Sequence, residues 1–419
     1  MKLLHKFGDP RLSVAFLLTF VNGLSMTMLF PVLPFVIKLY DQPEVVLGIL
    51  FATFSLFQFI AAPILGGLSD KYGRKPILIL TQAGTFLSWV VLGIAATLPE
   101  KTLFGFLLLP ILVIFLSRMF DGITGGNASV AQAMMADITK SEERSKVFGI
   151  NGAVFGFSIM IGPALGSLAM TGNQSYLGVA ILGGSISAIA LGIMFFILKE
   201  TLPPSKSSKE IKISLKKLNV FSQIQTWGKI PMIRSVIITK LFMYSAFVAY
   251  TSISTLYLID FFGFSADKVG YYLTFTGSFI IFHQSVSIRY FLGRFGDRWS
   301  LTFALFCLGI GFIVMGFSQN IIFFTLFYFV MVLGVALAFT TMGSLLSRSV
   351  DASHQGEVMG MSTSLESFIS IGIPILATYV YGLLDFSIYF IIAILPFIAF
   401  LISYFFSPNI DLPARKKHA

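Results

Sequence analysis

Apolar runs of about 20 residues, the length of helix that crosses a bilayer, recur along the whole of this 419-residue chain. Charged residues make up only 11% of the chain, whereas soluble domains contain about 25%. An aqueous surface cannot cover so much apolar sequence, so we expect an all-α membrane protein. Twelve transmembrane helices are predicted, at residues 12–37, 45–66, 76–97, 111–136, 146–170, 176–198, 233–259, 268–289, 300–317, 321–346, 357–381 and 387–406.

Lysine and arginine are unequally divided between the segments that join these spans. With both termini in the cytoplasm, the outer loops contain only Lys38, Lys101 and Lys268, and the inner segments contain nearly all the other basic residues. The positive-inside rule therefore predicts a multi-pass protein of the inner membrane with both termini cytoplasmic. The first apolar run lacks the short hydrophobic region and cleavage site of a signal peptide, so we expect a retained span.

Composition excludes several other classes of protein. The net charge of +10 follows from the topology and does not indicate a nucleic-acid partner, because no basic segment alternates with stacking aromatics. Cys307 is the single cysteine and lies within a span, which excludes a disulfide framework and a thiolate metal site. The sequence has no P-loop, catalytic triad or metal cluster. We therefore expect no enzyme activity, no metal and no cofactor.

A polar segment near the middle of the chain divides the spans into two groups of six. We expect an N-terminal half at residues 1–199, a cytoplasmic linker at 200–231 and a C-terminal half at 232–419. The linker is basic and contains two consecutive prolines. Apolar residues recur in it at helical spacing, which is typical of an amphipathic helix on the inner leaflet; a flexible, solvated linker is the alternative. The recurring residues are Ile211, Leu215, Leu218, Phe221 and Ile224.

The two halves show a weak internal repeat. Residues 71–78 and 294–301, which are 223 positions apart, share the order basic, aromatic, Gly, charged, basic, x, x, Leu. Residues 147–165 and 358–376, which are 211 positions apart, share a Val-x-Gly and a Pro-x-Leu. Duplicated six-span halves are typical of secondary transporters, whose substrate site lies between the halves near the membrane midplane.

A charged turn between the second and third spans identifies the family that this chain resembles. Residues 66–75 contain the pattern Gly-x-x-x-Asp-x-x-Gly-Arg-Lys, which resembles the loop 2–3 signature of the major facilitator superfamily. The resemblance implies a latch in which the aspartate caps a helix of the other half and the arginine pairs with an acid at the end of span 4. The alternative is a solvated turn that serves topology only. The latch residues would be Gly66, Asp70, Gly73, Arg74 and Asp137.

Spans 4 and 5 carry two further motifs. Arg118-Met-Phe-Asp121-Gly122-Ile-Thr-Gly-Gly126 matches the family pattern Arg-x-x-x-Gly-x-x-x-Gly. Its glycines let a neighbouring backbone approach, and its two charges lie on one helical face, as a functional or a purely structural pair. Span 5 resembles the antiporter signature of the family, with ordinary small-residue packing as the alternative. The residues of that signature are Gly156, Gly162, Pro163 and Gly166.

Over most of its length the chain resembles the twelve-span bacterial drug/proton antiporters, and particularly the tetracycline/proton antiporters. It departs from them at two positions. Tetracycline exporters carry acids at the places of Asn22 and Ser88. Tetracycline–metal recognition and the usual coupling site, which the resemblance implies, would therefore lack their acids here.

Other ionisable residues within spans are candidates for proton coupling. Glu366 lies about nine residues inside span 11, roughly 14 Å from its start and near the midplane. Asp121 with Arg118 is the second candidate. His283 could join a proton relay, because histidine titrates near physiological pH, or it could simply hydrogen-bond a neighbour. Lys240 could pair with Glu366 or contact an anionic substrate.

Polar and aromatic residues within spans outline a substrate cavity. Phe and Met surfaces suit promiscuous apolar ligands. The candidates are Asn22, Met26, Gln58, Asn127, Gln132, Asn151, Lys240, Tyr244, Phe247, Tyr250 and Gln284.

These features predict a proton-coupled exporter of small amphipathic molecules that works by alternating access. Its partners would be a small-molecule substrate, protons and membrane lipid, and we expect a monomer. One alternative is a transporter of a single endogenous metabolite, such as a siderophore or an amino-acid-like solute. An alternative of another class is a transport-dead sensor or lipid-handling protein on the same fold.

Overall fold

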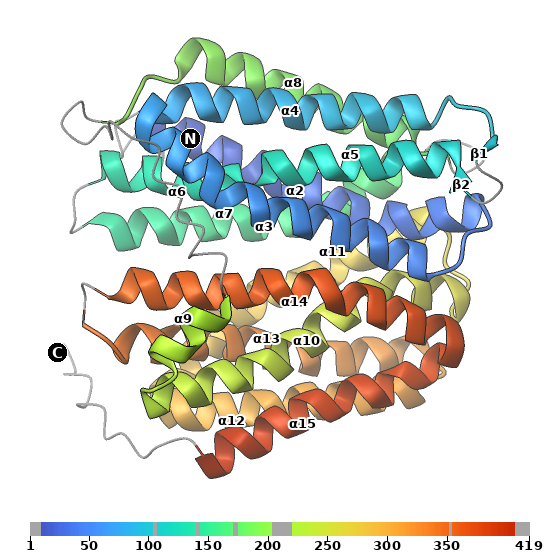
Figure 1. The fold of residues 1–419 in the computed structure, drawn as a ribbon. Helices are drawn as coiled ribbons and strands as arrows, with labels where there is room; N and C mark the ends of the chain where they lie inside the picture. The colour runs from blue at the N-terminus through green and yellow to red at the C-terminus, as the bar shows by residue number, and fades with distance from the viewer. Residues whose placement is uncertain are drawn as a thin grey trace. The chain divides into compact units, whose positions relative to one another are not determined.

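A computed structural model of the chain describes residues 10–103, 107–139, 143–170, 175–202, 220–351 and 354–406. Nearly all of these residues are helical (Figure 1). Two short strands, β1 (Thr102–Leu103) and β2 (Leu107–Leu108), pair to form an antiparallel ribbon. The helices are α2 (Pro10–Leu39), α3 (Val45–Tyr72), α4 (Arg74–Ala95), α5 (Leu109–Gly125), α6 (Asn127–Ile138), α7 (Arg144–Ala169), α8 (Leu177–Ile197), α9 (Val220–Trp227), α10 (Pro231–Asp260), α11 (Ala266–Phe282), η4 (His283–Ser287), α12 (Ile288–Phe317), α13 (Ile321–Arg348), α14 (Gln355–Leu384), η5 (Asp385–Ser387) and α15 (Ile388–Phe406).

The helices account for the twelve predicted spans. Ten stretches of the described chain are long and apolar enough to cross a membrane. Two of them, Ala266–Phe317 with 52 residues and Glu357–Phe405 with 49, each hold two crossings, because a single crossing needs about 20 residues. The first is broken at Gly296, whose backbone is non-helical, and the second at η5. The chain is therefore an all-α protein with twelve transmembrane helices, as predicted.

Contacts along the chain define two compact units. The first contains Met1–Asn219, Val248–Ile281 and Ser367–Ile388, and the second contains Val220–Phe247, Phe282–Glu366 and Tyr389–Ala419. These units group the segments that pack together in this conformation. The predicted halves rest instead on the polar segment near the middle of the chain and on the weak internal repeat. The division at residues 199 and 232 stays a prediction. Within the linker, the described helix is α9, and residues 203–219, which include Ile211, Leu215 and Leu218, lie outside the described residues.

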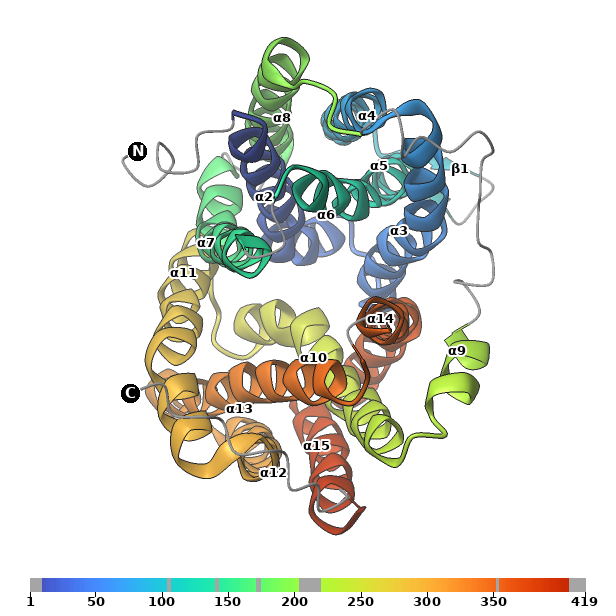
Figure 2. The same ribbon diagram turned by 90° about the vertical axis from the view of Figure 1, so that its left-hand side faces the viewer.

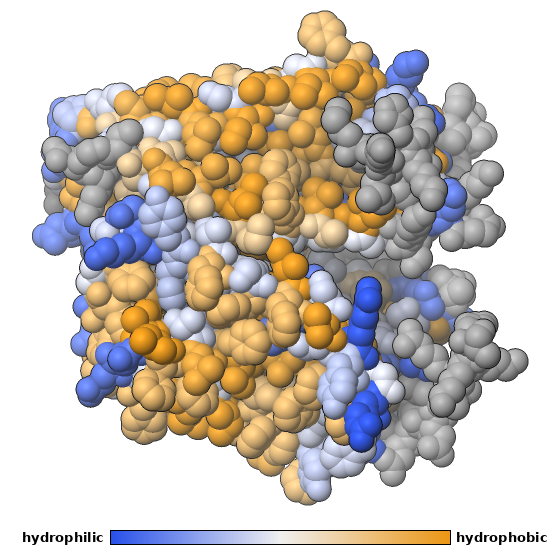
Figure 3. Space-filling view, turned by 180° about the vertical axis from the view of Figure 1, so that it is seen from behind, coloured by the Kyte–Doolittle hydropathy of each residue, from blue (hydrophilic) through white to orange (hydrophobic). Residues whose placement is uncertain are grey.

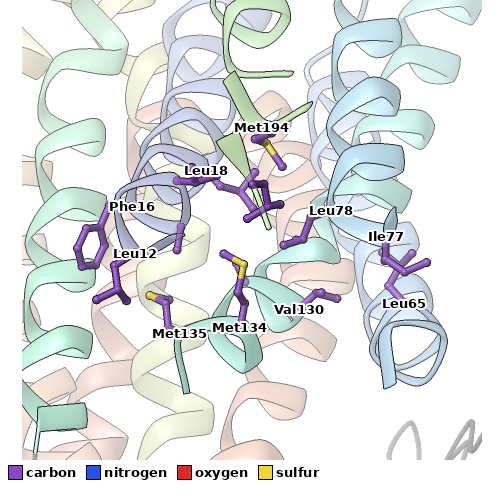
Figure 4. Close-up of a cluster of buried hydrophobic side chains, with 14 of the residues drawn as sticks. Leu12, Phe16, Leu18, Leu65, Ile77, Leu78, Val130, Met134, Met135 and Met194 are labelled. Atoms are coloured by element: carbon purple, nitrogen blue, oxygen red, sulfur yellow. The ribbon is translucent and has the colours of Figure 1, made fainter. Parts of the chain in front are cut away.

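In the first unit, α6 lies among α2, α3 and α4 (Figure 2). One end of these helices is held by a cluster of buried hydrophobic side chains from α2, α3, α4, α6, α7 and α8 (Figure 4). Phe16, Leu78, Met134 and Met194 belong to this cluster and are at most 5% exposed. Burial of side chains of this size stabilises each by about 1.5–3 kcal/mol against exposure to water. The cluster sits beside the charged turn between α3 and α4 and so supports it.

Large hydrophobic side chains also cover the outside of the helices. Phe196 is 83% exposed and Ile322 is 74% exposed. Figure 3 shows hydrophobic residues across much of one face, with hydrophilic ones gathered toward the ends of the helices. A soluble monomer rarely exposes apolar patches of this extent. The surface is that of a multi-pass membrane protein, in which lipid covers the apolar band.

Candidate functional site

The charged turn between α3 and α4 is shorter than the predicted loop. α3 continues to Tyr72 and α4 begins at Arg74, so only Gly73 is non-helical. Gly73 has φ +100°, a conformation that side-chain-bearing residues rarely adopt. A Cβ at this position would also lie 2.3 Å from a carboxylate oxygen of Glu200. At Gly66, by contrast, a Cβ would meet open space among the described residues, so no neighbour requires a glycine there.

Arg74 is the centre of an ionic network at this turn. Its Nε donates to Asp137 at 3.2 Å, and its Nη1 donates to Asp70 at 2.7 Å and to the Ser69 hydroxyl at 2.6 Å. The Arg74 side chain is 8% exposed and that of Asp137 is 12% exposed, so this ion pair is poorly screened by water. Arg74 thus pairs with Asp137 at the end of span 4, and the role of this network as a latch stays a prediction. Asp70 is 53% exposed and binds Arg74 within the turn.

Glu200, three residues beyond α8, is a member of this network that the sequence analysis missed. Its carboxylate accepts hydrogen bonds from the backbone N–H groups of Arg74 at 2.9 Å and Lys75 at 3.1 Å, and thus caps the N-terminus of α4. It also accepts from the N–H groups of Thr201 and Leu202, both at 2.8 Å. Burial by itself raises the pKa of Glu200, but the four backbone donors outweigh it, and the pKa lies below its ordinary value of 4.5. The sequence signal that could have identified Glu200 is an acidic residue directly after the sixth apolar run.

The second unit contains a charge-reversed copy of the same arrangement. Gly296 has φ +71° and occupies the turn position of Gly73, 223 residues later. Asp297 follows it, in the place of Arg74, and accepts hydrogen bonds from Arg348 at 3.1 Å and Ser344 at 3.0 Å. Arg348 lies 211 residues after Asp137 at the end of the corresponding span. The offset of 223 residues relates Arg74 to Asp297, and the offset of 211 residues relates Asp137 to Arg348. The ion pair of the first unit thus recurs in the second unit with its positive and negative members exchanged.

The pair predicted in span 4 forms in α5. Arg118 Nη1 donates to Asp121 at 3.0 Å, and both side chains are less than 10% exposed. Gly122 packs against α3, where a Cβ would lie 2.5 Å from the Phe54 carbonyl oxygen. This close approach confirms the packing role predicted for the glycine pattern. Arg118 Nε has no hydrogen-bond partner among the described residues.

Neutral polar groups occupy positions 22 and 88, where the family resemblance implied acids. Asn22 Nδ2 donates to Asn127 Oδ1 at 2.8 Å, and Asn127 is fully buried. Ser88 is also fully buried and donates to the Thr85 carbonyl at 2.8 Å. Asn127 Nδ2 is left without a partner among the described residues, so this part of the first unit holds a buried, unused donor. Neither position supplies a negative charge.

Lys240 and Glu366 form an ion pair in the second unit, which is one of the two arrangements predicted for Lys240. Lys240 Nζ also donates to the Ser362 hydroxyl at 2.5 Å. The side chains of Lys240 and Glu366 are 9% and 26% exposed. Ser362 lies one helical turn before Glu366 on α14, so both contacts come from one face of that helix. The pair joins the middle of α10 to α14.

An aromatic group lies on the same face of α10 as Lys240. Tyr244 and Phe247 follow Lys240 by four and seven residues and therefore share its face of the helix. Their rings contact each other and Phe339 of α13, with centroid distances of 5.6–6.1 Å. The site of the second unit thus combines one buried ion pair with three aromatic rings.

His283 is 1% exposed and begins the π-helical turn η4, a rare geometry that is frequent at functional sites. Its Nε2 donates to the Phe329 carbonyl at 3.1 Å, and its Nδ1 lies 2.9 Å from the Ser287 hydroxyl. Both ring nitrogens therefore have partners, as the hydrogen-bonding alternative predicts. A role in a proton relay stays a prediction.

The remaining cavity candidates differ in their surroundings. Asn151 accepts from Thr19 at 2.6 Å, and Gln58 donates to the Gly125 carbonyl at 3.2 Å. Tyr250 is buried at 5% exposure. The side chains of Met26, Gln132 and Gln284 are exposed.

The antiporter-motif helix, α7, packs tightly over only part of its length. A Cβ at Gly162 would lie 2.0 Å from the Thr27 hydroxyl, and one at Gly166 would lie 2.1 Å from the Met28 carbonyl oxygen. Pro163 lies in the same tight segment. Gly156, by contrast, faces open space among the described residues. Two of the motif glycines thus allow α7 to approach α2, and the third leaves a bare helix surface.

A second polar cluster, the Lys38 cluster, closes the ends of three helices opposite the charged turn. Asp260, the last residue of α10, forms an ion pair with Lys38 near the end of α2. Its other oxygen accepts from the Tyr381 hydroxyl of α14 at 3.0 Å. Sequence reasoning missed this cluster because its members are far apart in the chain. Among the described residues, no group of three His, Cys, Asp or Glu side chains could hold a metal.

Comparison with known proteins decides the family. The family model of the Major Facilitator Superfamily matches residues 15–294 and 285–418. The chain belongs to the major facilitator superfamily. Members of this superfamily are transporters and not enzymes. The turns at Gly73 and Gly296 both lie within the matched residues.

Three relatives illustrate the range of the superfamily around this chain. It is 26% identical to the class C tetracycline resistance protein of Escherichia coli over 369 residues, which cover 86% of this chain and 87% of the relative. A D-xylose–proton symporter matches with a TM-score of 0.75 and 17% identity, over 95% of this chain and 98% of that one. The human organic anion transporter MFSD10 matches with a TM-score of 0.67 and 21% identity, over 94% and 99%. At these identities the two structures support the fold alone.

Proposed function

We propose that this protein is a proton-coupled antiporter that exports small amphipathic molecules across the inner membrane, with both termini in the cytoplasm. The observation that carries the proposal is the buried ion pair of Lys240 and Glu366. An uncompensated charge within a membrane is costly. Protonation of Glu366 removes the partner of Lys240 and therefore changes the relative stability of arrangements of α10 and α14. A proton can drive a conformational change only by altering the relative stability of two conformations in this way.

Clusters at opposite ends of the helices support alternating access. The Lys38 cluster joins the ends of α2, α10 and α14 on the side that we assign to the outside. The Arg74 network lies at the other end of α3, on the side that we assign to the cytoplasm. Ligands or protons shift a transporter between states only through contacts that differ between those states. We propose that both clusters are formed in the conformation described here and that each separates in a different state, so that the two ends open in turn.

Export of drug-like molecules is supported by the tetracycline resistance proteins, which match along most of the chain. The aromatic group of Tyr244, Phe247 and Phe339 offers flat apolar surface beside the ion pair. Stacking on such rings requires no particular hydrogen-bond pattern. It therefore suits substrates that are similar in shape but carry different functional groups. We expect the protein to work as a monomer surrounded by lipid.

A second candidate function, transport of one anionic metabolite, is favoured by the positive charge of Lys240. The human relative MFSD10 is described as an organic anion transporter. An anion would bind Lys240 best when Glu366 is protonated, because the two negative groups then do not compete. Binding linkage is reciprocal, so an anion and a proton would bind together and travel in the same direction. A cationic amphiphile would instead compete with the proton, because it binds best beside ionised Glu366.

The direction of coupled proton movement therefore tests the proposal. Purified protein is reconstituted in vesicles that contain a pH-sensitive dye, and ethidium or a small aromatic carboxylate is added in the absence of a pH gradient. Proton movement opposite to ethidium supports the antiporter. Proton movement with the carboxylate supports the anion transporter. If neither probe nor a wider panel of charged amphiphiles moves protons, the proposal is wrong.

A further inference from the structure

A cleft in the second unit lies outside the site described above. It is formed by the first residues of α10 and by α15, and it has a volume of about 310 Å³. Pro231, Arg234, Ser235, Ile238 and Ile402 line it. None of these residues contributes to the ion pair, the aromatic group or the duplicated turns.

The charged residues on the two segments that form the cleft are all basic. Arg234 is exposed, and Lys229 is exposed five residues earlier. Neither the segment from Val220 to Phe247 nor α15 contains an aspartate or glutamate. None of the ion pairs between described residues includes Arg234. Pro231 is the first residue of α10, so the positive end of the helix dipole also lies at the cleft.

The polar part of the cleft lies near the start of α10, and its apolar part lies further along the same helix. Ile238 lies one turn beyond Arg234, about 6 Å deeper in the span, and is 38% exposed. Ile402 of α15 supplies a second aliphatic wall. Two residues after Ile402, the Tyr404 ring contacts Trp299 of α12. Tryptophan and tyrosine gather at the membrane–water interface, so the cleft opens at the depth of lipid headgroups.

We propose that this cleft binds an anionic phospholipid of the cytoplasmic leaflet. Arg234 and the N-terminus of α10 take the phosphate, and Ile238 and Ile402 take the start of an acyl chain. The assignment rests on the proposed function only for its orientation, which places the start of α10 on the cytoplasmic side. Basic pockets between transmembrane helices on that side suit such headgroups. Lys240 lies six residues further along α10, so the bound lipid would steady the helix that carries the coupling pair.

The test measures lipid binding and needs no transport substrate. Full-length protein is purified, and native mass spectrometry counts retained lipids after titration with phosphatidylglycerol or phosphatidylcholine. Arg234→Gln removes the charge, Ile402→Trp fills the apolar wall, and Arg289→Gln is the control, because it removes an exposed basic residue of α12 that does not line the cleft. We expect one phosphatidylglycerol to bind in preference to phosphatidylcholine. Arg234→Gln should weaken it about fivefold, which corresponds to about 1 kcal/mol for one basic residue.

Three other results would overturn the proposal of a lipid site. Equal retention of phosphatidylglycerol by the parent protein, Arg234→Gln and Ile402→Trp overturns the proposal. An equal loss in Arg289→Gln also overturns it, because binding then follows net charge and not this cleft. Inorganic phosphate should not raise the melting temperature as phosphatidylglycerol does; if it does so equally, the site takes free phosphate and not lipid. Failure of ethidium transport would leave this lipid measurement unaffected, so the two proposals fail separately.

Discussion

Replacing Glu366 with glutamine gives the sharpest test of the coupling proposal. The amide keeps the shape of the side chain and can still accept a hydrogen bond, but it cannot ionise. Lys240, whose other described partner is the neutral Ser362 hydroxyl at 2.5 Å, therefore loses the negative charge that balances its own. Removing one partner of a buried ion pair costs about 3–5 kcal/mol. Glu366 is 26% exposed, and water reaches a group of that exposure, so we expect about 2–3 kcal/mol. The substitution should lower the melting temperature of the purified protein by several degrees.

A double variant separates stability from coupling. Lys240→Met together with Glu366→Gln removes both charges, so no unpaired charge is left, and the unpaired charge is the main cost of breaking a buried pair. We expect the double variant to regain most of the lost thermal stability. Proton movement driven by ethidium should remain absent in both variants, because neither carries an acid at this place. The assay is the dye-loaded vesicle measurement, with the parent protein and empty vesicles beside it.

One result would refute this reasoning directly. If Glu366→Gln folds and still moves protons against ethidium at the parental rate, Glu366 does not carry the proton. The buried Asp121 beside Arg118 would then be the next candidate. If the double variant is less stable than Glu366→Gln alone, the unpaired charge of Lys240 is not the source of the instability.

Four further predictions address the packing of α7, the duplicated ion pair, the cap on α4 and the substrate. Gly166→Ala should destabilise the protein by about 1–3 kcal/mol, because its Cβ would lie 2.1 Å from a carbonyl oxygen of α2, whereas Gly156→Ala should leave the melting temperature unchanged or slightly raised. Arg348→Asp should reduce transport, and adding Asp297→Arg should restore it; no recovery would argue against a simple charge pair. The lowered pKa of Glu200 means that its stabilising contribution is present above pH 4.5 and is lost as the pH falls through the lowered value, so Glu200→Gln should lower the melting temperature at pH 7 by more than at pH 3. Neutral residues at the two positions where tetracycline exporters carry acids predict no tetracycline resistance in a susceptible host, and a large, proton-dependent gain over an empty vector would contradict this.

Much of the architecture follows from local sequence. A run of about 20 apolar residues can satisfy its backbone within a membrane only as a helix, so the twelve spans could be located without knowing their neighbours. The repeat at residues 71–78 and 294–301 likewise predicted two equivalent turns. The glycines at positions 73 and 296 both adopt positive φ, because each turn reverses the chain in a single residue.

Contacts between distant residues required the tertiary structure. The family resemblance implied that Arg74 pairs with Asp137, but nothing in the sequence showed that Glu200 caps α4, because the acid lies 126 residues from its partner. The Lys38 cluster joins residues 222 positions apart. Local hydrophobicity contains no information about such pairs, since each member alone resembles any charged residue at a helix end.

The sequence by itself determined that this chain crosses the membrane twelve times and which charges lie within spans; the relation between its two halves stays a prediction. Only the tertiary structure decided which of those charges neutralise one another. Lys240 could have met a substrate or an acid, and the packing of α10 against α14 brings it to Glu366. The reason is physical. Helix formation depends on neighbours a few residues away, whereas the pairing of buried charges depends on which helix faces meet.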